Sequence, residues 1–133
     1  MKKLLTLFLL FSYSVQAQQV PQDLIGTRTG KVTEWDGPSK GEVYRVNITL
    51  NTGGFKEKVG TVNHPDYRCG GDLYLKESTS IEIAVIEMLT YGKTLCVNEG
   101  AVKLSFAVDK VIYEWQHHSL PNRAQEVLRK KTS

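Results

Sequence analysis

The chain has 133 residues, with 17 Lys or Arg against 14 Asp or Glu, and 41% of its residues are hydrophobic. This composition excludes an intrinsically disordered chain, and the length suits one hydrophobic core rather than two. Setting aside an N-terminal leader removes two lysines and leaves 15 basic against 14 acidic residues, so a nucleic-acid partner has no electrostatic basis.

Residues 1–17 have the features of a cleavable signal peptide. Lys2 and Lys3 precede an apolar run over residues 4–11, and Val15 and Ala17 supply small residues at the spacing that signal peptidase recognises. A membrane anchor is the alternative, but it needs a longer apolar run. No other stretch approaches the roughly 18 apolar residues of a membrane span. We therefore expect a periplasmic or secreted protein with no membrane span after cleavage.

The next segments are an N-terminal arm over residues 18–25 and a β-rich domain over residues 26–118. Within that domain, turn residues recur every 8 to 14 positions, which is typical of an antiparallel meander. A weak strand over residues 27–35 precedes the clearest one, residues 44–50, in which apolar and polar side chains alternate. The sequence Asn51-Thr52-Gly53-Gly54 then predicts a turn.

Further strands are predicted along the rest of this domain. Weaker ones cover residues 55–62 and 72–76. Residues 81–89 are apolar at both alternating sets of positions, which favours a central strand covered on both sides, with a short helix as the alternative. Residues 102–108 and 111–116 suit a hairpin. Seven or eight strands must close or stack to hide their edges, so we predict an all-β fold, either a small lipocalin-like meander barrel or a sandwich.

The C-terminal residues 119–133 predict a short helix and tail. Ser119 can cap a helix and Pro121 suits its first turn, and three apolar residues then fall on one helical face: Ala124, Val127 and Leu128. The basic run over residues 129–131 suits a solvated helix end, with a tail that binds acidic partners as the alternative.

Cys69 and Cys96 are the two cysteines of the chain, and in an exported protein they predict a disulfide. A redox pair is the alternative, but such pairs usually stand two residues apart. No zinc site is expected from two cysteines without a nearby histidine pair, and His64, His117 and His118 lack the spacing of metal ligands. We expect no cofactor and no metal.

The densest group of reactive side chains lies in residues 64–72. His64 and Asp66 are candidate acid–base residues of a hydrolase, whereas Tyr67 and Arg68 are candidate contacts for a ligand or partner. The same segment has the Pro and Gly residues of an ordinary inter-strand loop. Since no phosphate loop, nucleophile elbow or zinc-binding helix accompanies it, we expect a protein that is not an enzyme.

Glu87 is a candidate of another kind, because it continues the alternation of Ile83 and Val85 and should point into the apolar layer. A buried carboxylate needs a partner or a raised pKa. One interpretation is a structural ion pair with Arg68 or Arg45. The other is a polar anchor for a ligand inside the barrel, with a wall drawn from six aromatic residues: Trp35, Tyr44, Tyr67, Tyr91, Tyr113 and Trp115.

Several short motifs carry a resemblance to a known family. They are Gly26-Thr27-x-x-Gly30-x-Val32, Gly60-x-Val62-x-x-Pro65, Cys69-Gly70-Gly71-x-Leu73-x-Leu75, Glu87-x-x-x-x-Gly92, Cys96-Val97 and Tyr113-x-Trp115. Together they resemble a small exported bacterial domain that also forms the extracellular C-terminal part of some serine/threonine kinases. The resemblance implies a compact β domain with Cys69 joined to Cys96, and a role in binding or sensing. Arg28 departs from it, since the family tends to carry an aromatic residue there.

These observations lead to a functional expectation with one alternative. We expect an exported, monomeric binding domain that grips a protein or cell-envelope partner through surface loops, as inhibitors and immunity proteins do. The alternative is a lipocalin-like carrier of a small apolar or amphipathic molecule. Candidate contact residues are His64, Tyr67, Arg68 and Glu87.

Overall fold

The computed structural model describes residues 18–107, 110–117, 119 and 123–130, so the predicted signal peptide lies outside the described residues. Within these residues, two single-turn 3₁₀ helices, η1 (Gln22–Leu24) and η2 (Pro65–Tyr67), accompany eight strands. The strands are β1 (Gly26–Asp36), β2 (Val43–Leu50), β3 (Lys58–His64), β4 (Cys69–Ser78), β5 (Glu82–Tyr91), β6 (Gly100–Ala107), β7 (Lys110–His117) and β8 (Arg123–Lys130). No helix among the described residues is long and apolar enough to cross a membrane.

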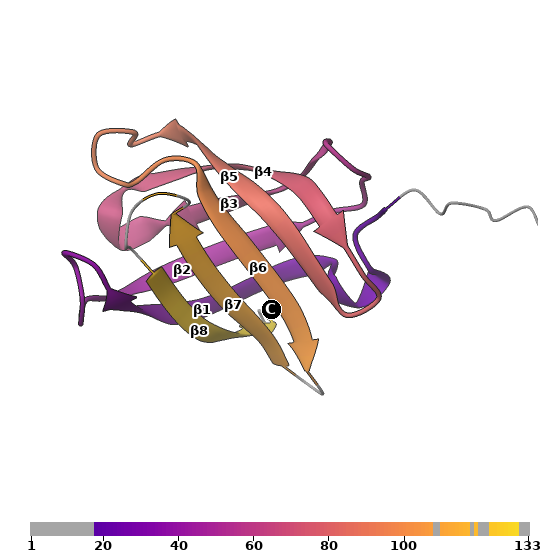
Figure 1. Cartoon of the computed structure of the whole chain (residues 1–133), viewed down its shortest axis with the longest axis horizontal. Helices are drawn as coiled ribbons and strands as arrows, with labels where there is room; N and C mark the ends of the chain where they lie inside the picture. Colours follow the sequence, from indigo (N-terminus) through magenta and orange to yellow (C-terminus); the bar gives the residue numbers. More distant parts are fainter. Residues whose placement is uncertain (1–17, 108–109, 118, 120–122, 131–133) are drawn as a thin grey trace, which may run out of the picture.

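Each strand pairs with the next one along the chain in antiparallel fashion, and β8 pairs with β1 to close a barrel (Figure 1). The predicted all-β meander barrel is therefore confirmed, and of the two architectures left open the sandwich is excluded. The predicted hairpin is also confirmed, since β6 pairs with β7 from Gly100 opposite His117 to Ala107 opposite Lys110. Closure gives each of the described strands a paired neighbour on both sides.

The core fills the barrel, because strict alternation sends every second side chain inward. On β2 these residues are Tyr44, Val46, Ile48 and Leu50, all buried. The end of the barrel that receives the N-terminal arm is closed by η1, whose Leu24 is fully buried. Arg28 fixes η1 there by donating hydrogen bonds from its guanidinium to the carbonyl oxygens of Leu24 and Asp23. Burial lowers the pKa of Arg28.

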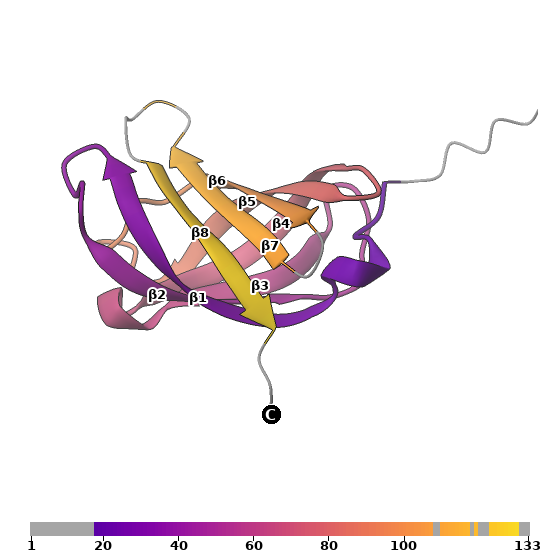
Figure 2. The same ribbon diagram turned by 90° about the horizontal axis from the view of Figure 1, so that it is seen from below.

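The predicted C-terminal helix is wrong, because Arg123–Lys130 is the closing strand β8. Figure 2 shows β8 between β7 and β1. Ala124 and Leu128 face the core, whereas Val127 lies on the other side of the strand, where it is paired with Ile112. A spacing of three and four residues fits a helix face equally well, but only a strand pairs with both open edges of the sheet. The barrel therefore continues past residue 118.

The strand predicted over residues 81–89 is confirmed as β5, but its outer face is not covered. Ile83, Val85, Glu87 and Leu89 point inward and are buried. On the outer face Met88 is exposed and Ile86 is half-buried. A run that is apolar on both faces thus forms an ordinary barrel strand with a partly exposed apolar exterior.

Candidate functional site

A cavity of about 230 Å³ opens at the end of the barrel opposite η1, and we call it the mouth cavity. Its inner wall is built from Glu34, Tyr44, His64, Glu87 and Trp115, all of them buried. Its rim consists of Ser39, Glu42, Tyr67, Leu95, Cys96 and Val97. The rim residues come from the connections β1–β2, β3–β4 and β5–β6, together with η2.

Three buried polar residues reach the cavity by the same sequence pattern. Each stands two positions beyond a buried valine that faces the core: Glu34 after Val32, His64 after Val62, and Glu87 after Val85. Because side chains alternate along a strand, a polar residue at that spacing extends the inward series by one layer. The layer lies at one end of the barrel, which makes that end polar and leaves the middle apolar.

His64 and Glu87 form a buried pair in the inner wall, with exposed fractions of 5% and 1%. The His64 Nε2 lies 3.0 Å from the Glu87 Oε2. The prediction that Glu87 points inward is confirmed. The predicted partner is wrong, because Arg45 instead forms an exposed ion pair with Asp66 at 2.8 Å and Arg68 is exposed. The His64 Nδ1 has no hydrogen-bond partner among the described residues.

Glu34 is the second buried carboxyl group of the inner wall, with 8% of its surface exposed. The Tyr44 hydroxyl donates to Glu34 Oε1 at 3.0 Å, and no described residue bonds the Oε2. Burial raises the pKa of Glu34, the nearby Glu42 carboxylate raises it further, and the hydrogen bond from Tyr44 opposes both effects. Glu34 is therefore costly to ionise unless a cation or a further donor reaches it.

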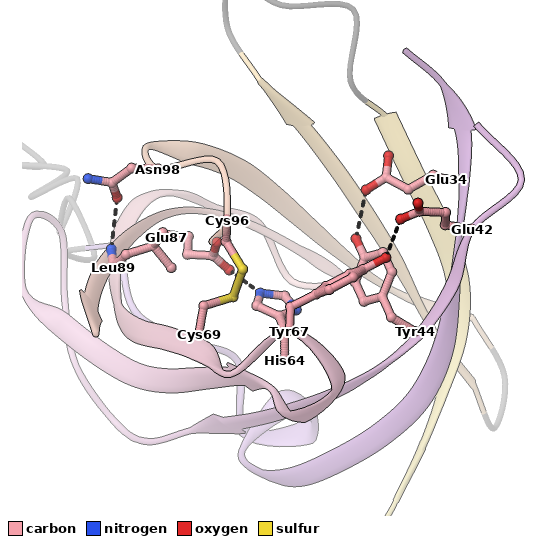
Figure 3. Close-up of a disulfide and its surroundings, with 10 residues drawn as sticks. All are labelled: Glu34, Glu42, Tyr44, His64, Tyr67, Cys69, Glu87, Leu89, Cys96 and Asn98. Carbon is pink, nitrogen blue, oxygen red and sulfur yellow. Dashed lines mark hydrogen bonds and ion pairs between the residues drawn. A yellow bond between two sulfur atoms is a disulfide. The ribbon is translucent and has the colours of Figure 1, made fainter. Parts of the chain in front are cut away.

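Tyr67 belongs to the wall of the cavity rather than to a free surface loop. Its ring lies 4.8 Å from that of Tyr44, centroid to centroid, and its hydroxyl donates to Glu42 Oε2. Tyr44 in turn meets His64 edge-on at 5.7 Å. Figure 3 shows these residues as a continuous row running from the His64–Glu87 pair to Glu34 and Glu42.

The predicted disulfide is confirmed, since Cys69 and Cys96 lie at bonding distance. It ties the β5–β6 connection, residues 92–99, to the start of β4 and thereby holds part of the rim in place (Figure 3). Gly92 permits this close approach, because it has a φ of 67° and a Cβ there would lie 2.7 Å from the Cys69 Cα. The Asn98 side chain braces the same segment by accepting hydrogen bonds from the backbone N–H groups of Leu89 and Glu99.

Trp115 completes the inner wall because Gly100 leaves room for its indole ring. Gly100 stands opposite Glu87 in the sheet, and a Cβ on Gly100 would lie 2.0 Å from the indole Nε1 of Trp115. Only glycine allows the indole to occupy this position beside the carboxyl layer. The ring thus supplies an aromatic surface inside the barrel.

The structure does not bring His64 and Asp66 together as an acid–base pair. Asp66 is exposed on η2, where it accepts hydrogen bonds from the backbone N–H and the guanidinium of Arg45. These bonds hold the pKa of Asp66 below its ordinary value. His64 faces the interior.

Comparison with known proteins adds no assignment. No protein-family model and no curated protein sequence matches the chain. The resemblance to the kinase-linked domain therefore stays a prediction.

The sequence predicts some of the residues that line the mouth cavity and not others. Of the six aromatic residues considered for a pocket wall, Tyr44, Tyr67 and Trp115 line the mouth cavity. Tyr113 is buried in the core, and Trp35 and Tyr91 are exposed. Glu34, Glu42 and Leu95 also line the cavity, although no motif in the sequence marks them. The alternation that identified Glu87 would also have identified Glu34.

Proposed function

We propose that this protein is an exported barrel that binds a small organic molecule in the mouth cavity. The observation that carries the proposal is the pair of buried polar atoms without partners among the described residues, Glu34 Oε2 and His64 Nδ1, in the wall of one cavity. Buried polar atoms cost free energy unless they are hydrogen-bonded. A concave site with aromatic walls and a few convergent polar groups is the usual form of a small-molecule site.

The size of the cavity limits the ligand. A buried cavity of about 150 Å³ accommodates benzene, so the 230 Å³ here suits a molecule with one ring and a short polar arm. Leu95, Val97 and Trp115 offer an apolar surface for the ring. The polar arm would meet the carboxyl and imidazole layer.

We propose binding rather than catalysis. A histidine paired with a carboxylate can act as a general base when a nucleophile or a substrate stands at its other nitrogen. Here no hydroxyl or thiol among the described residues bonds the His64 Nδ1, and Cys96 is held in the disulfide. Export remains part of the proposal, and the disulfide supports it because such bonds persist in oxidising compartments.

The expectation of a protein or cell-envelope partner bound through residues 64–72 has less support. Of the candidate contacts, His64 and Glu87 are buried and Tyr67 is half-buried against Tyr44. Only Arg68 is fully available to a partner. A surface of this kind lacks the central cluster of anchoring side chains that a tight interface needs.

Native mass spectrometry tests the proposal on protein purified gently from the compartment to which its own host exports it. We compare the wild type with Val97→Trp, which fills the cavity, and with Val43→Trp, which adds the same bulk on the exposed outside of β2. Leu95→Trp at the rim serves if Val97→Trp does not fold.

The expected result is a small-molecule adduct on the wild type and on Val43→Trp, which the cavity-filling variant loses. An adduct that a folded Val97→Trp retains would contradict the proposal. A stoichiometric protein partner with no small adduct would favour the surface-loop alternative instead.

A further inference from the structure

We propose that the mouth cavity selects a protonated organic amine, whose ammonium group is held between the Glu34 carboxyl and the rings of the inner wall. This inference rests on the proposed function, because it names the class of ligand for the same cavity. It follows from the charge, the donor and acceptor inventory, and the aromatic content of the wall.

The charge of the wall excludes anionic ligands. Among the described residues that line the cavity, three carry carboxyl groups, Glu34, Glu42 and Glu87, and none is Lys or Arg. Of these described lining residues, His64 is the one whose side chain can carry a positive charge, and it is already paired with Glu87. A carboxylate or phosphate placed here would meet like charges without a free cation to compensate them.

The hydrogen-bonding groups of the wall are mostly acceptors. The Tyr44 hydroxyl donates a hydrogen bond to Glu34, and the Tyr67 hydroxyl donates one to Glu42. Burial raises the pKa of both phenols, so the protons stay on the hydroxyl groups. Each phenol oxygen can then only accept a further hydrogen bond, as can Glu34 Oε2 when Glu34 is ionised. A ligand that brings two or three N–H donors fits such a wall.

Among the carboxyl groups of the cavity, Glu34 offers a specific contact for the ammonium group of the ligand. It is more than nine-tenths buried, and its Oε2 is without a partner among the described residues. An ammonium ion beside it would favour the ionised carboxylate that burial otherwise disfavours, which couples ligand binding to ionisation. When the imidazole of His64 is uncharged and its Nε2 donates to Glu87, the unpaired Nδ1 would be a second acceptor in the same wall.

The aromatic wall suits an organic cation better than a metal ion. In the part of the chain that the structure describes, no group of three His, Cys, Asp or Glu side chains is placed to hold a metal. The rings of Tyr44, Tyr67 and Trp115 instead offer electron-rich faces, which attract ammonium groups. The apolar rim at Leu95 and Val97 would cover the hydrocarbon part of the ligand.

The test uses three probes of one size: benzylamine as the cation, benzyl alcohol as the neutral analogue and benzoate as the anion. Trp35→Phe removes the exposed indole, so the remaining fluorescence comes from Trp115 in the cavity wall. In this background we titrate each probe at neutral pH and measure the affinity. We repeat the series with Glu34→Gln, and with Glu114→Gln as a control on the exposed face of β7.

We expect benzylamine to bind about tenfold or more tightly than benzyl alcohol, because one charge-assisted hydrogen bond has at least this effect. Benzoate should not bind. Glu34→Gln should remove the preference for benzylamine and leave the affinity for benzyl alcohol unchanged, whereas Glu114→Gln should change neither.

The outcomes separate the two proposals. Binding of benzyl alcohol or benzoate as tight as that of benzylamine would overturn the selectivity for amines but leave a ligand site in the cavity. The same holds if Glu34→Gln folds and keeps the full preference. Failure of all three probes to alter the Trp115 emission would overturn the selectivity for amines. The native mass spectrum would then decide the proposed function, because a small adduct that Val97→Trp loses supports it and the lack of such an adduct contradicts it.

Discussion

Removing the disulfide tests the link between the rim and the stability of the barrel. Cys69 and Cys96 close a loop of 27 residues, which restricts the unfolded chain. On the chain-entropy relation this corresponds to about 3.5 kcal/mol at 25 °C, a large share of the 5–15 kcal/mol typical of a folded domain. A loss of that size should lower the melting temperature by roughly 10 °C or more.

The variant is Cys69→Ala combined with Cys96→Ala, and the assay is urea unfolding followed by circular dichroism. We expect a loss of about 2–4 kcal/mol in the free energy of unfolding, and a similar loss for the wild type under reductant. The double variant itself should not respond to reductant, which provides the control. A double variant within about 0.5 kcal/mol of the wild type would refute the reasoning, since that is the range of ordinary surface substitutions.

Three further predictions concern the cavity wall. Replacing Glu87 by Leu leaves His64 buried without its partner and should lower the free energy of unfolding, measured in urea, by about 1–3 kcal/mol. Leu at both positions should recover part of this loss. Purely additive losses would show that the two side chains are not coupled. Replacing Glu34 by Gln should stabilise the protein at neutral pH. The pKa of Glu34 is raised in the folded state. The contribution of Glu34 to the free energy of unfolding is therefore fully present below its pKa in the unfolded chain, and it is lost as the pH rises through its pKa in the folded protein. The stability difference between Glu34→Gln and the wild type should therefore vanish in acid, and a constant difference across the pH range would contradict the argument. Tyr67→Ala should weaken the binding of benzylamine, measured by calorimetry, about tenfold or more. Arg68→Ala on the exposed loop should leave this affinity unchanged. The reverse pattern would favour a surface partner. The titratable side chains that face Glu34 are Glu42, Tyr44 and His64.

The strands could be predicted from the sequence because alternation is a local signal. Residues 44–50 and the hairpin of β6 and β7 follow from it directly. The last strand could not be predicted in this way, because the spacing of Ala124, Val127 and Leu128 also fits a helix. The fold of that segment is decided by the two open strand edges that it joins. One belongs to β7, directly before it in the chain, but the other belongs to β1, which is formed by residues far away in the sequence.

The site was predictable only in part for a related reason. Glu87 could be placed inside because it lies within a strand of clear alternation. His64 could not be recognised as its partner, since the predicted strand ends at residue 62 and the observed one continues to His64. The strand is therefore two residues longer than predicted, and a histidine that was expected in a loop lies buried inside the barrel. The pairing itself joins positions 23 residues apart, which depends on the register of β3, β4 and β5.

The most direct test of a ligand in the mouth cavity uses the two tryptophans of the protein as reporters of the two sides of the barrel wall. Trp115 lies inside at the cavity, and Trp35 is 47% exposed on the outside against Arg123. The indole N–H resonances of the ¹⁵N-labelled protein can be followed during titration with benzylamine. The account predicts a saturable shift of the Trp115 resonance while that of Trp35 stays in place. A shift confined to Trp35, or a Trp115 resonance that does not move at saturating probe, would contradict it.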